Sequence, residues 1–148
     1  LDPRPIFKRF HIPSLQKDLL ISDKKWHSWI SNVIKKNIKR SELSKFKNIH
    51  YGLIGTADKF LSSSNEIKKI KQVLPDLKAV EMEGASFAQV AEQEGIPWTI
   101  VRVISDSADE SASEDFSEFI NQYNYSSKRL IKCILDNFQS SPKFKSIN

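Results

Sequence analysis

The stretch Ala79-Val80-Glu81-Met82-Glu83-Gly84-Ala85 decides the interpretation of this chain, because a short apolar run ends abruptly in two carboxylates. A second stretch, Thr99-Ile100-Val101-Arg102-Val103-Ile104-Ser105-Asp106, repeats the pattern and ends in a serine and an aspartate. Short β-branched runs of this kind predict buried strands. Because an unpaired buried carboxylate is costly, each acidic end requires a partner, a proton or a ligand.

The two acidic ends predict one pocket, lined by Glu81, Glu83, Ser105 and Asp106, since ligands of open α/β sheets bind just beyond the carboxyl ends of strands. Glu83 opens an expected helix over residues 83–94, where exposed N–H groups favour an ionised carboxylate that can accept hydrogen bonds from vicinal sugar hydroxyls. Asp106 follows an apolar run, where loss of water favours a protonated carboxyl group, and Ser105 can orient it. These roles predict cleavage of a bond between a sugar and a poor leaving group.

Helices and strands are expected to alternate along the chain, which predicts an α/β sandwich. Residues 1–20 are expected to be extended and loop-like, because prolines exclude an early helix. Ser22 is the predicted cap of the first helix, and Ser64 or Asn65 that of the second. The periodicity predicts helices over 22–40, 65–74, 83–93 and 115–138, and strands over 49–55, 78–82 and 98–105.

The Glu81–Ala85 motif and the run Arg102-Val103-Ile104-Ser105-Asp106-Ser107-Ala108-Asp109 resemble the nucleoside phosphorylase and nucleosidase superfamily, in particular its 5′-methylthioadenosine/S-adenosylhomocysteine nucleosidases. The stretch Gly52-Leu53-Ile54-Gly55-Thr56-Ala57-Asp58-Lys59-Phe60-Leu61 resembles the family's strand and loop whose aromatic side chain packs on the purine. Phe116 and Phe119 resemble the start of its last long helix. Residues 2–7 with Pro13 resemble a segment near its dimer interface, so the resemblance spans about residues 2–138.

The resemblance implies a three-layer αβα sandwich of the nucleoside phosphorylase type that hydrolyses the N-glycosidic bond of 5′-methylthioadenosine or S-adenosylhomocysteine and releases adenine. Asp106 would protonate the adenine at N7, and Ser105 would orient Asp106. The implied substrate-binding residues are Phe60, Leu61, Glu81, Met82, Glu83, Arg102, Ala108 and Phe116. Phe7 and Pro13 would reach the 5′-group bound by the other subunit of a homodimer.

The resemblance also implies a part of the domain that this sequence does not show. The family's domain starts upstream of Leu1, with the first strands of its sheet, a glycine-rich turn and the carboxylate that activates the attacking water, and nothing in residues 1–50 resembles these pieces. Residues 1–148 are therefore expected to be the C-terminal part of a single nucleosidase-like domain, incomplete at its N-terminus, with a polar tail over 140–148. The isolated chain is expected to be weakly active or inactive.

Two other functions stay open at this point. A phosphorylase would replace the attacking water with phosphate, and a non-catalytic relative or inactive fragment would bind nucleosides without turnover. Each proposed site residue also has a structural alternative: Glu83 as a helix cap, Asp106 as a loop-opening residue, Arg102 as an ion-pair partner of the glutamates, and Phe60 as part of the core.

Composition narrows the classes of partner. The net charge of +5 is of the sign found in proteins that bind nucleic acids. The lysines, however, fall mostly on the polar faces of two expected helices, so no nucleic-acid partner is expected. The sequence contains no run of about 18 apolar residues, so no membrane-spanning helix is predicted. Residues 1–10 lack the apolar core of a signal peptide, and the single cysteine, Cys133, permits no internal disulfide, so a cytoplasmic protein is expected. The scattered histidines make no metal spacing, and no cofactor is expected.

Overall fold

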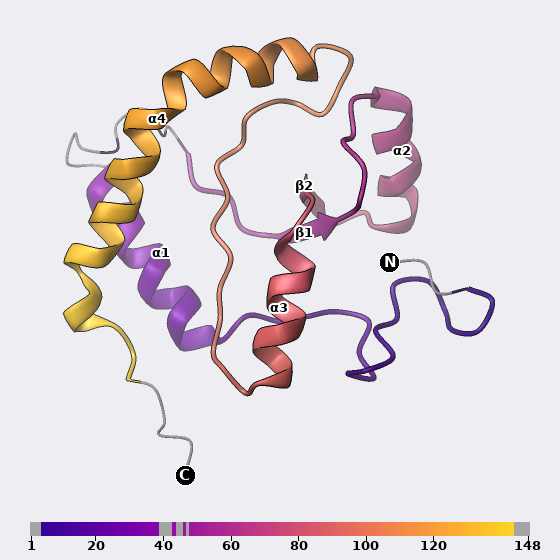
Figure 1. Cartoon of the computed structure of the whole chain (residues 1–148), viewed down its shortest axis with the longest axis horizontal. Coiled ribbons are helices and arrows are strands. Elements are labelled where there is room, and N and C mark those ends of the chain that lie inside the picture. Colours follow the sequence, from indigo (N-terminus) through magenta and orange to yellow (C-terminus); the bar gives the residue numbers. More distant parts are fainter. Residues whose placement is uncertain (1–3, 39–42, 44–45, 47, 144–148) are drawn as a thin grey trace.

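The structure is a computed structural model that describes residues 4–38, 43, 46 and 48–143, except the side chains of residues 121, 122 and 124–126. Figure 1 shows its elements, which alternate between helix and strand before a long final helix. They are α1 (Lys24–Ile38), β1 (Leu53–Thr56), α2 (Ser64–Val73), β2 (Leu77–Glu81), α3 (Gly84–Gln93), α4 (Ala112–Asp136) and the 3-10 helix η1 (Phe138–Ser140). The predicted alternation is confirmed. The expected continuation of the first helix to residue 40, residues 2–3 of the interface-like segment and residues 144–148 of the tail lie outside the described residues.

The strands β1 and β2 form a parallel pair connected through α2. The register places Leu53 opposite Leu77 at one end and Thr56 opposite Glu81 at the other. Both strands therefore end at the same edge of the sheet, and α3 begins there, directly after the Glu81–Glu83 turn. This edge is where ligands bind in open α/β sheets.

The prediction of a strand over residues 98–105 is wrong in the described structure. The segment is not helical, but it pairs with no strand among the described residues. Among the backbone groups that the structure describes, only the carbonyl of Trp98 in this segment takes part in a backbone–backbone hydrogen bond, which it accepts from the N–H of Asp23 at 3.1 Å. The β-branched residues set the local conformation, but a strand also requires a neighbouring chain to complete its ladder.

The helix boundaries agree with the sequence to within a few residues, while the predicted caps do not. Asp23, rather than Ser22, caps α1, because its Oδ1 accepts the N–H groups of Lys25 at 2.9 Å and Trp26 at 3.0 Å. At the start of α2, Ser63 occupies the cap position without a side-chain hydrogen bond, and Ser64 is bonded elsewhere. Within the described range, no helix is long and apolar enough to cross a bilayer.

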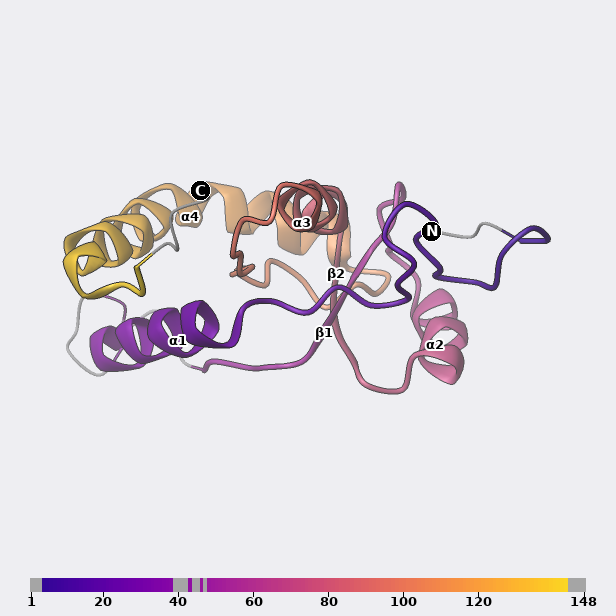
Figure 2. The ribbon, with the colours of Figure 1, turned by 90° about the horizontal axis from the view of Figure 1, so that it is seen from below.

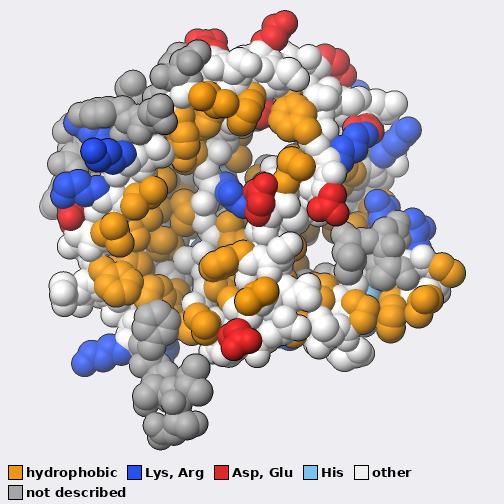
Figure 3. All heavy atoms as spheres, in the orientation of Figure 1, with side chains coloured by type: hydrophobic (Ala, Val, Ile, Leu, Met, Phe, Trp, Pro, Cys, Tyr) orange, Lys and Arg blue, Asp and Glu red, His pale blue; other side chains and the backbone are white. Residues whose placement is uncertain are grey.

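Two small cores hold the elements. One lies between α1 and α4, where the buried residues are Val33, Ile34, Leu43, Leu130 and Cys133, and Figures 1 and 2 show these helices side by side. The other joins α3 to the start of the extended segment through Ala88, Ala91 and Trp98. Large hydrophobic side chains remain exposed between and around these cores, and Figure 3 shows many on one face of the molecule.

Candidate active site

Glu81, at the end of β2, is the centre of a hydrogen-bonded junction. Its Oε2 accepts the backbone N–H groups of Glu83 at 3.1 Å and Gly84 at 2.7 Å. Its Oε1 accepts the hydroxyl of Thr56, whose Oγ1 in turn accepts the N–H of Ala85 at 2.9 Å. The Glu81 side chain is only 9% exposed. The carboxylate and the Thr56 hydroxyl together satisfy the first N–H groups of α3, which lack partners within a helix.

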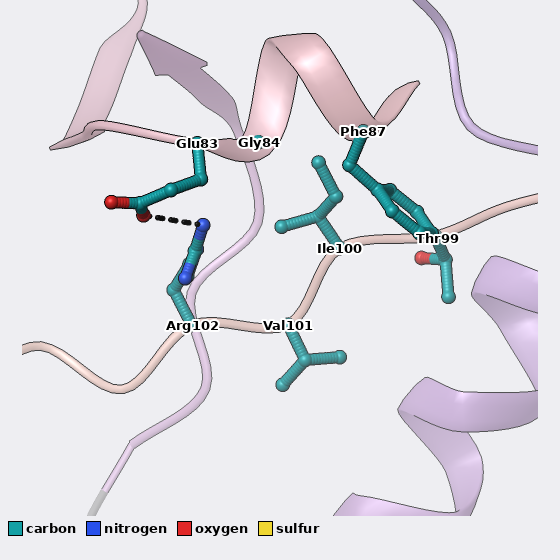
Figure 4. Close-up of a pocket in the computed structure, with 7 residues that line it drawn as sticks. All are labelled: Glu83, Gly84, Phe87, Thr99, Ile100, Val101 and Arg102. Carbon is teal, nitrogen blue, oxygen red and sulfur yellow. Dashed lines mark hydrogen bonds and ion pairs between the residues drawn. The ribbon is translucent and has the colours of Figure 1, made fainter. Parts of the chain in front are cut away.

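Arg102 adds a positive charge to this junction. Its guanidinium pairs with the Glu81 carboxylate and lies 3.3 Å from Oε2 of Glu83, as Figure 4 shows for Glu83. Burial by itself would raise the pKa of Glu81, but the Thr56 hydroxyl, the two backbone N–H groups and the Arg102 charge lower that pKa below its ordinary value. The ion-pair interpretation of Arg102 is therefore confirmed.

Gly84 is favoured here by close approach. A Cβ at this position would lie 2.9 Å from Oε1 of Glu81 and 3.0 Å from its Oε2. The small residue lets the chain turn from β2 into α3 directly over the carboxylate. The spacing of the Glu-x-Glu-Gly motif thus has a local physical reason, independent of any ligand.

Glu83 has a different environment from Glu81, although only one residue separates them. Its side chain is 73% exposed and makes no hydrogen bond that caps α3. It lines an open pocket of about 340 Å³, whose other lining residues are Gly84, Phe87, Thr99, Ile100, Val101 and Arg102. Figure 4 shows Glu83 and Arg102 facing one another, while Phe87 and Ile100 lie farther along the pocket. Glu83 therefore occupies the N-cap position of α3, as the structural alternative has it, but its side chain makes no capping hydrogen bond and its exposed carboxylate lines the pocket.

Asp106 is oriented through both of its carboxyl oxygens. The hydroxyl of Ser105 donates to Oδ2 at 2.6 Å, and the backbone N–H of Ala108 donates to Oδ1 at 2.8 Å. Ala108 has a φ of 54°, a left-handed conformation that is uncommon for non-glycine residues. This turn holds the carboxyl group at the end of the extended segment, partly buried.

An aromatic pair connects the loop before α2, which holds Phe60, to the first turns of α4, which hold Phe116. The rings of Phe60 and Phe116 have centroids 6.3 Å apart and are tilted by 59°. They are 44% and 41% exposed, so the interpretation of Phe60 as simple core is wrong, whereas Leu61 beside it is buried. Exposed aromatic rings suit stacking on a planar base. Glu110 connects the loop before α4 to the start of α2. Its carboxylate accepts hydrogen bonds from the backbone N–H of Ser64, at 3.1 Å, and from the Ser64 hydroxyl, at 2.7 Å.

The predicted residues therefore form two polar clusters and an aromatic pair. One cluster is the Glu81 junction with Glu83 and Arg102, and the other holds Ser105, Asp106 and Ala108. The aromatic pair is Phe60 with Phe116. The pocket beside Glu83 does not include Ser105 or Asp106, and no hydrogen bond or ion pair between described residues joins the clusters. Phe60 follows Thr56 by four positions, and Asp106 follows Arg102 by four positions. A chain of that length spans at most about 14 Å, so the clusters are neighbours.

The remaining predicted residues lie apart from these clusters or contact them little. Met82 is 42% exposed at the turn before α3. Phe7 stacks on His11 with ring centroids 5.2 Å apart, and the carbonyl of Pro13 accepts the side-chain amide of Gln16 at 2.6 Å. No described contact brings Phe7 or Pro13 to either cluster.

The sequence missed two residues that shape the site, Thr56 and Glu110. A signal for Thr56 exists, because a parallel pairing of the two strands ends with Thr56 opposite Glu81. Glu110 gives no such signal, since its partner Ser64 lies 46 positions away in the sequence. In the part of the chain that the structure describes, no group of three histidine, cysteine or acidic residues is placed to hold a metal ion.

Comparison with known proteins places this geometry in a family. The sequence profile of the Phosphorylase superfamily matches residues 6–136. A 5′-methylthioadenosine/S-adenosylhomocysteine nucleosidase of Buchnera aphidicola is 34% identical over 131 residues, which is 88% of this chain and 53% of the relative. The chain thus spans about half the length of the curated relatives it matches.

Two solved structures have the same fold. The nucleosidase of S. pneumoniae, bound to a transition-state inhibitor, matches with a TM-score of 0.69 at 32% identity, covering 83% of this chain and 50% of the other. The enzyme of Colwellia psychrerythraea, in complex with adenine, matches with a TM-score of 0.74 at 27% identity, covering 99% of this chain and 57% of the other. The predicted fold of the nucleoside phosphorylase type is confirmed. The chain belongs to the Phosphorylase superfamily.

Proposed function

We propose that this chain supplies the base-binding and ribose-binding side of a nucleosidase that releases adenine from 5′-methylthioadenosine or S-adenosylhomocysteine. The observation that carries the proposal is the contrast between Glu83 and Asp106. Glu83 presents an exposed carboxylate to an open pocket, whereas Asp106 is held through both oxygens by Ser105 and Ala108. The first environment suits the recognition of hydroxyl groups, and the second suits a positioned acid. The functions of the relatives named above support the same reaction.

In the proposed mechanism, Asp106 donates a proton to N7 of the adenine while the bond between C1′ and the base breaks. The bonding electrons leave with the base, and a water molecule adds to the oxocarbenium-like C1′ and loses its own proton. Protonation of a leaving group by a positioned acid contributes about 10²- to 10⁴-fold in rate. Ser105 orients the acid, so its contribution is made through Asp106.

The remaining residues bind the two halves of the substrate. Phe60 would stack on or flank the adenine, the backbone of Leu61 would hydrogen-bond it, and Ala108 and Phe116 would border it or the 5′-substituent. The 2′- and 3′-hydroxyls of the ribose would be held by Glu83, beside Met82. The exposed rings at Phe60 and Phe116 and the exposed carboxylate of Glu83 support this division.

Glu81 and Arg102 are assigned a positioning role rather than direct contact with the ribose. The Glu81 carboxylate already accepts hydrogen bonds from Thr56, Glu83 and Gly84 and pairs with Arg102. A carboxylate with this many internal donors has little capacity left for a ligand. Its effect on the ribose is therefore transmitted through the position of Glu83 at the start of α3.

We further propose that the described residues are part of one domain, whose water-activating base lies in the portion that the longer relatives have and this chain lacks. The whole enzyme is proposed to be a cytoplasmic homodimer, as the family resemblance implies. In that dimer Phe7, which is 39% exposed, and Pro13 would approach the 5′-substituent bound by the other subunit. Light scattering of the whole protein measures the assembly directly.

A phosphorylase is the less favoured alternative. Its phosphate would need a cationic site close to C1′, and Arg102, the arginine closest to Glu83 in the structure, is already shared by two carboxylates. A nucleosidase needs no such anion site. Phosphate dependence of adenine release therefore separates the two reactions.

The test is adenine release from 5′-methylthioadenosine in phosphate-free buffer, followed chromatographically. It is run with this chain alone and with the separately produced portion of the Buchnera relative that the chain does not match. Release that requires the second portion and is unchanged by added phosphate is the expected result. Adenine binding without release, even in the mixture, would identify a non-catalytic relative. The proposal is rejected if neither adenine nor the nucleoside binds in either sample.

A further inference from the structure

A residue from a distant loop supplies the acceptor for the first backbone N–H of α2. Glu110 accepts the N–H of Ser64 at 3.1 Å through Oε1 and the Ser64 hydroxyl at 2.7 Å through Oε2. The local cap residue, Ser63, makes no side-chain hydrogen bond to the helix. Because the first N–H groups of a helix lack partners within it, Glu110 takes the place of a local cap. The Ser64 hydroxyl is also the main cause that lowers the pKa of Glu110, so this carboxylate is ionised at neutral pH.

A second contact joins the same two segments of the chain. Phe60 lies four positions before Ser64, in the loop before α2. Phe116 lies six positions after Glu110, in α4, and its ring centroid is 6.3 Å from that of Phe60. Figure 1 shows the chain that enters α4 beside the start of α2. Within the described ranges, no other hydrogen bond or ion pair joins residues 57–64 to residues 106–116, so Glu110 makes the polar link between the segments that carry the two rings.

The loop that carries Glu110 is ordered by its own hydrogen bonds. At its beginning, the N–H of Ala108 donates to the Asp106 carboxyl group at 2.8 Å. In its middle, Oδ1 of Asp109 accepts the N–H of Ser111 at 3.0 Å and the Ser111 hydroxyl at 2.7 Å. A loop bonded in this way moves as one piece. The position of Glu110 is therefore coupled to the position of the Asp106 carboxyl group.

We propose that Glu110 is a positioning residue for the purine. By holding the start of α2 against the loop before α4, it sets the place of the Phe60 ring relative to Phe116 and to the Asp106 carboxyl group. The inference rests on the proposed function, in which Phe60 flanks the base and Asp106 protonates it. A base beside Phe60 must present N7 within hydrogen-bond reach of the acid, so the separation of the two segments controls both base affinity and proton transfer.

A cap without this positioning role makes a different prediction. It would stabilise α2 and leave the aromatic pair and the affinity for a base unchanged when it is removed. The conservative variant Glu110→Gln keeps the contact, because its amide oxygen can accept the N–H of Ser64 while its NH₂ group donates to the Ser64 hydroxyl. Positioning therefore predicts that glutamine replaces glutamate and that alanine does not.

The test compares the wild type with Glu110→Ala and Glu110→Gln in two measurements. One is the nuclear Overhauser contact between the ring protons of Phe60 and Phe116 in this chain. The other is adenine affinity, by calorimetry, of each chain combined with the portion of the Buchnera relative that the chain does not match. Glu110→Ala should lose the ring contact and bind adenine about fivefold or more weakly, since one stacked aromatic ring contributes at least that factor. Glu110→Gln should keep both properties.

Glu114→Ala is the matched control, because Glu114 is an exposed acid in the first turn of α4 and makes no side-chain hydrogen bond to a described residue. It should keep the ring contact and the affinity. Glu110 is exposed, so its variants should fold, which circular dichroism checks.

Three outcomes separate the inference from its alternatives. If Glu110→Ala lowers the free energy of unfolding but keeps both the ring contact and the adenine affinity, Glu110 is a cap only and the inference is rejected. A loss in Glu110→Gln as large as that in Glu110→Ala would assign the effect to charge and would also overturn it. A ring contact that depends on Glu110 in a protein that binds neither adenine nor nucleoside would keep the positioning of Phe60 and reject the proposed function.

Discussion

At the scale of single residues, the two glutamates of the motif differ because their partners differ. Glu81 lies under the first turn of α3 and is surrounded by donors, whereas Glu83 lies at the rim of an open pocket. The sequence placed both in a binding site, because the chemistry of the side chain is the same. The two proposed roles, positioning for Glu81 and ligand binding for Glu83, can be distinguished only once the pairing of the strands is known, because this pairing brings Thr56 opposite Glu81.

The first prediction concerns Thr56, whose hydroxyl links Glu81 to Ala85. Thr56→Val removes a donor to a buried carboxylate and an acceptor for a helix N–H, so we expect a loss of about 1–3 kcal/mol in the free energy of unfolding. Urea denaturation measures this loss. Thr56→Ser keeps the hydroxyl and should recover most of the stability. Equal stability of the valine and serine variants would show that the hydroxyl does not hold the junction.

The second prediction concerns the pH dependence of the same junction. Because the folded state lowers the pKa of Glu81, its contribution to stability is present above the ordinary pKa of about 4.3 and is lost as the pH falls through the folded pKa. Unfolding free energies at pH 6 and pH 3 should therefore differ more in the wild type than in Glu81→Gln. The other carboxylates are the same in both proteins and cancel in the comparison. Identical differences would contradict the assigned network.

At the scale of elements, the periodicity of the sequence placed the helices and β2 closely, whereas β1 begins four residues later than the strand predicted over 49–55. The predicted helix over 65–74 and strand over 78–82 each lie within one residue of α2 and β2. The prediction of a strand over 98–105 was wrong for a different reason, because the residues of a strand do not determine which strands lie beside it. Caps were also missed, because several neighbouring side chains can serve and the local turn selects one.

The third prediction tests the cap of α1. Asp23→Ala removes the acceptor for the N–H groups of Lys25 and Trp26, and loss of such a cap costs about 0.5–2 kcal/mol. Thermal or urea unfolding should detect the change. Ser22→Ala, at the position that the sequence alone favours, is the matched control and should leave stability nearly unchanged. A larger loss in the Ser22 variant would restore the sequence-based assignment.

At the scale of the whole molecule, the chain has small cores, a short sheet and an open apolar face. Glu83, Asp106 and Phe60 follow strand-like runs that can be read locally, so the sequence alone could identify them as candidate site residues. It could not show that Glu83 and Asp106 lie in separate clusters, or that Glu110 bonds to Ser64 at the start of α2. Those features depend on contacts between segments that are distant in the sequence.

At the same scale, Asp106 is proposed to be the acid that protonates the leaving adenine. The most direct measurement is the rate of adenine release from 5′-methylthioadenosine, compared between the wild type and Asp106→Asn. Each chain is combined with the portion of the Buchnera relative that the chain does not match. Asp109→Asn is the matched control, because Asp109 lies in the same loop and is bonded to Ser111. We predict that Asp106→Asn slows release by about 10²- to 10⁴-fold while adenine affinity is retained, and that Asp109→Asn has little effect. Release of adenine by Asp106→Asn at the wild-type rate would contradict the role of Asp106 as the acid.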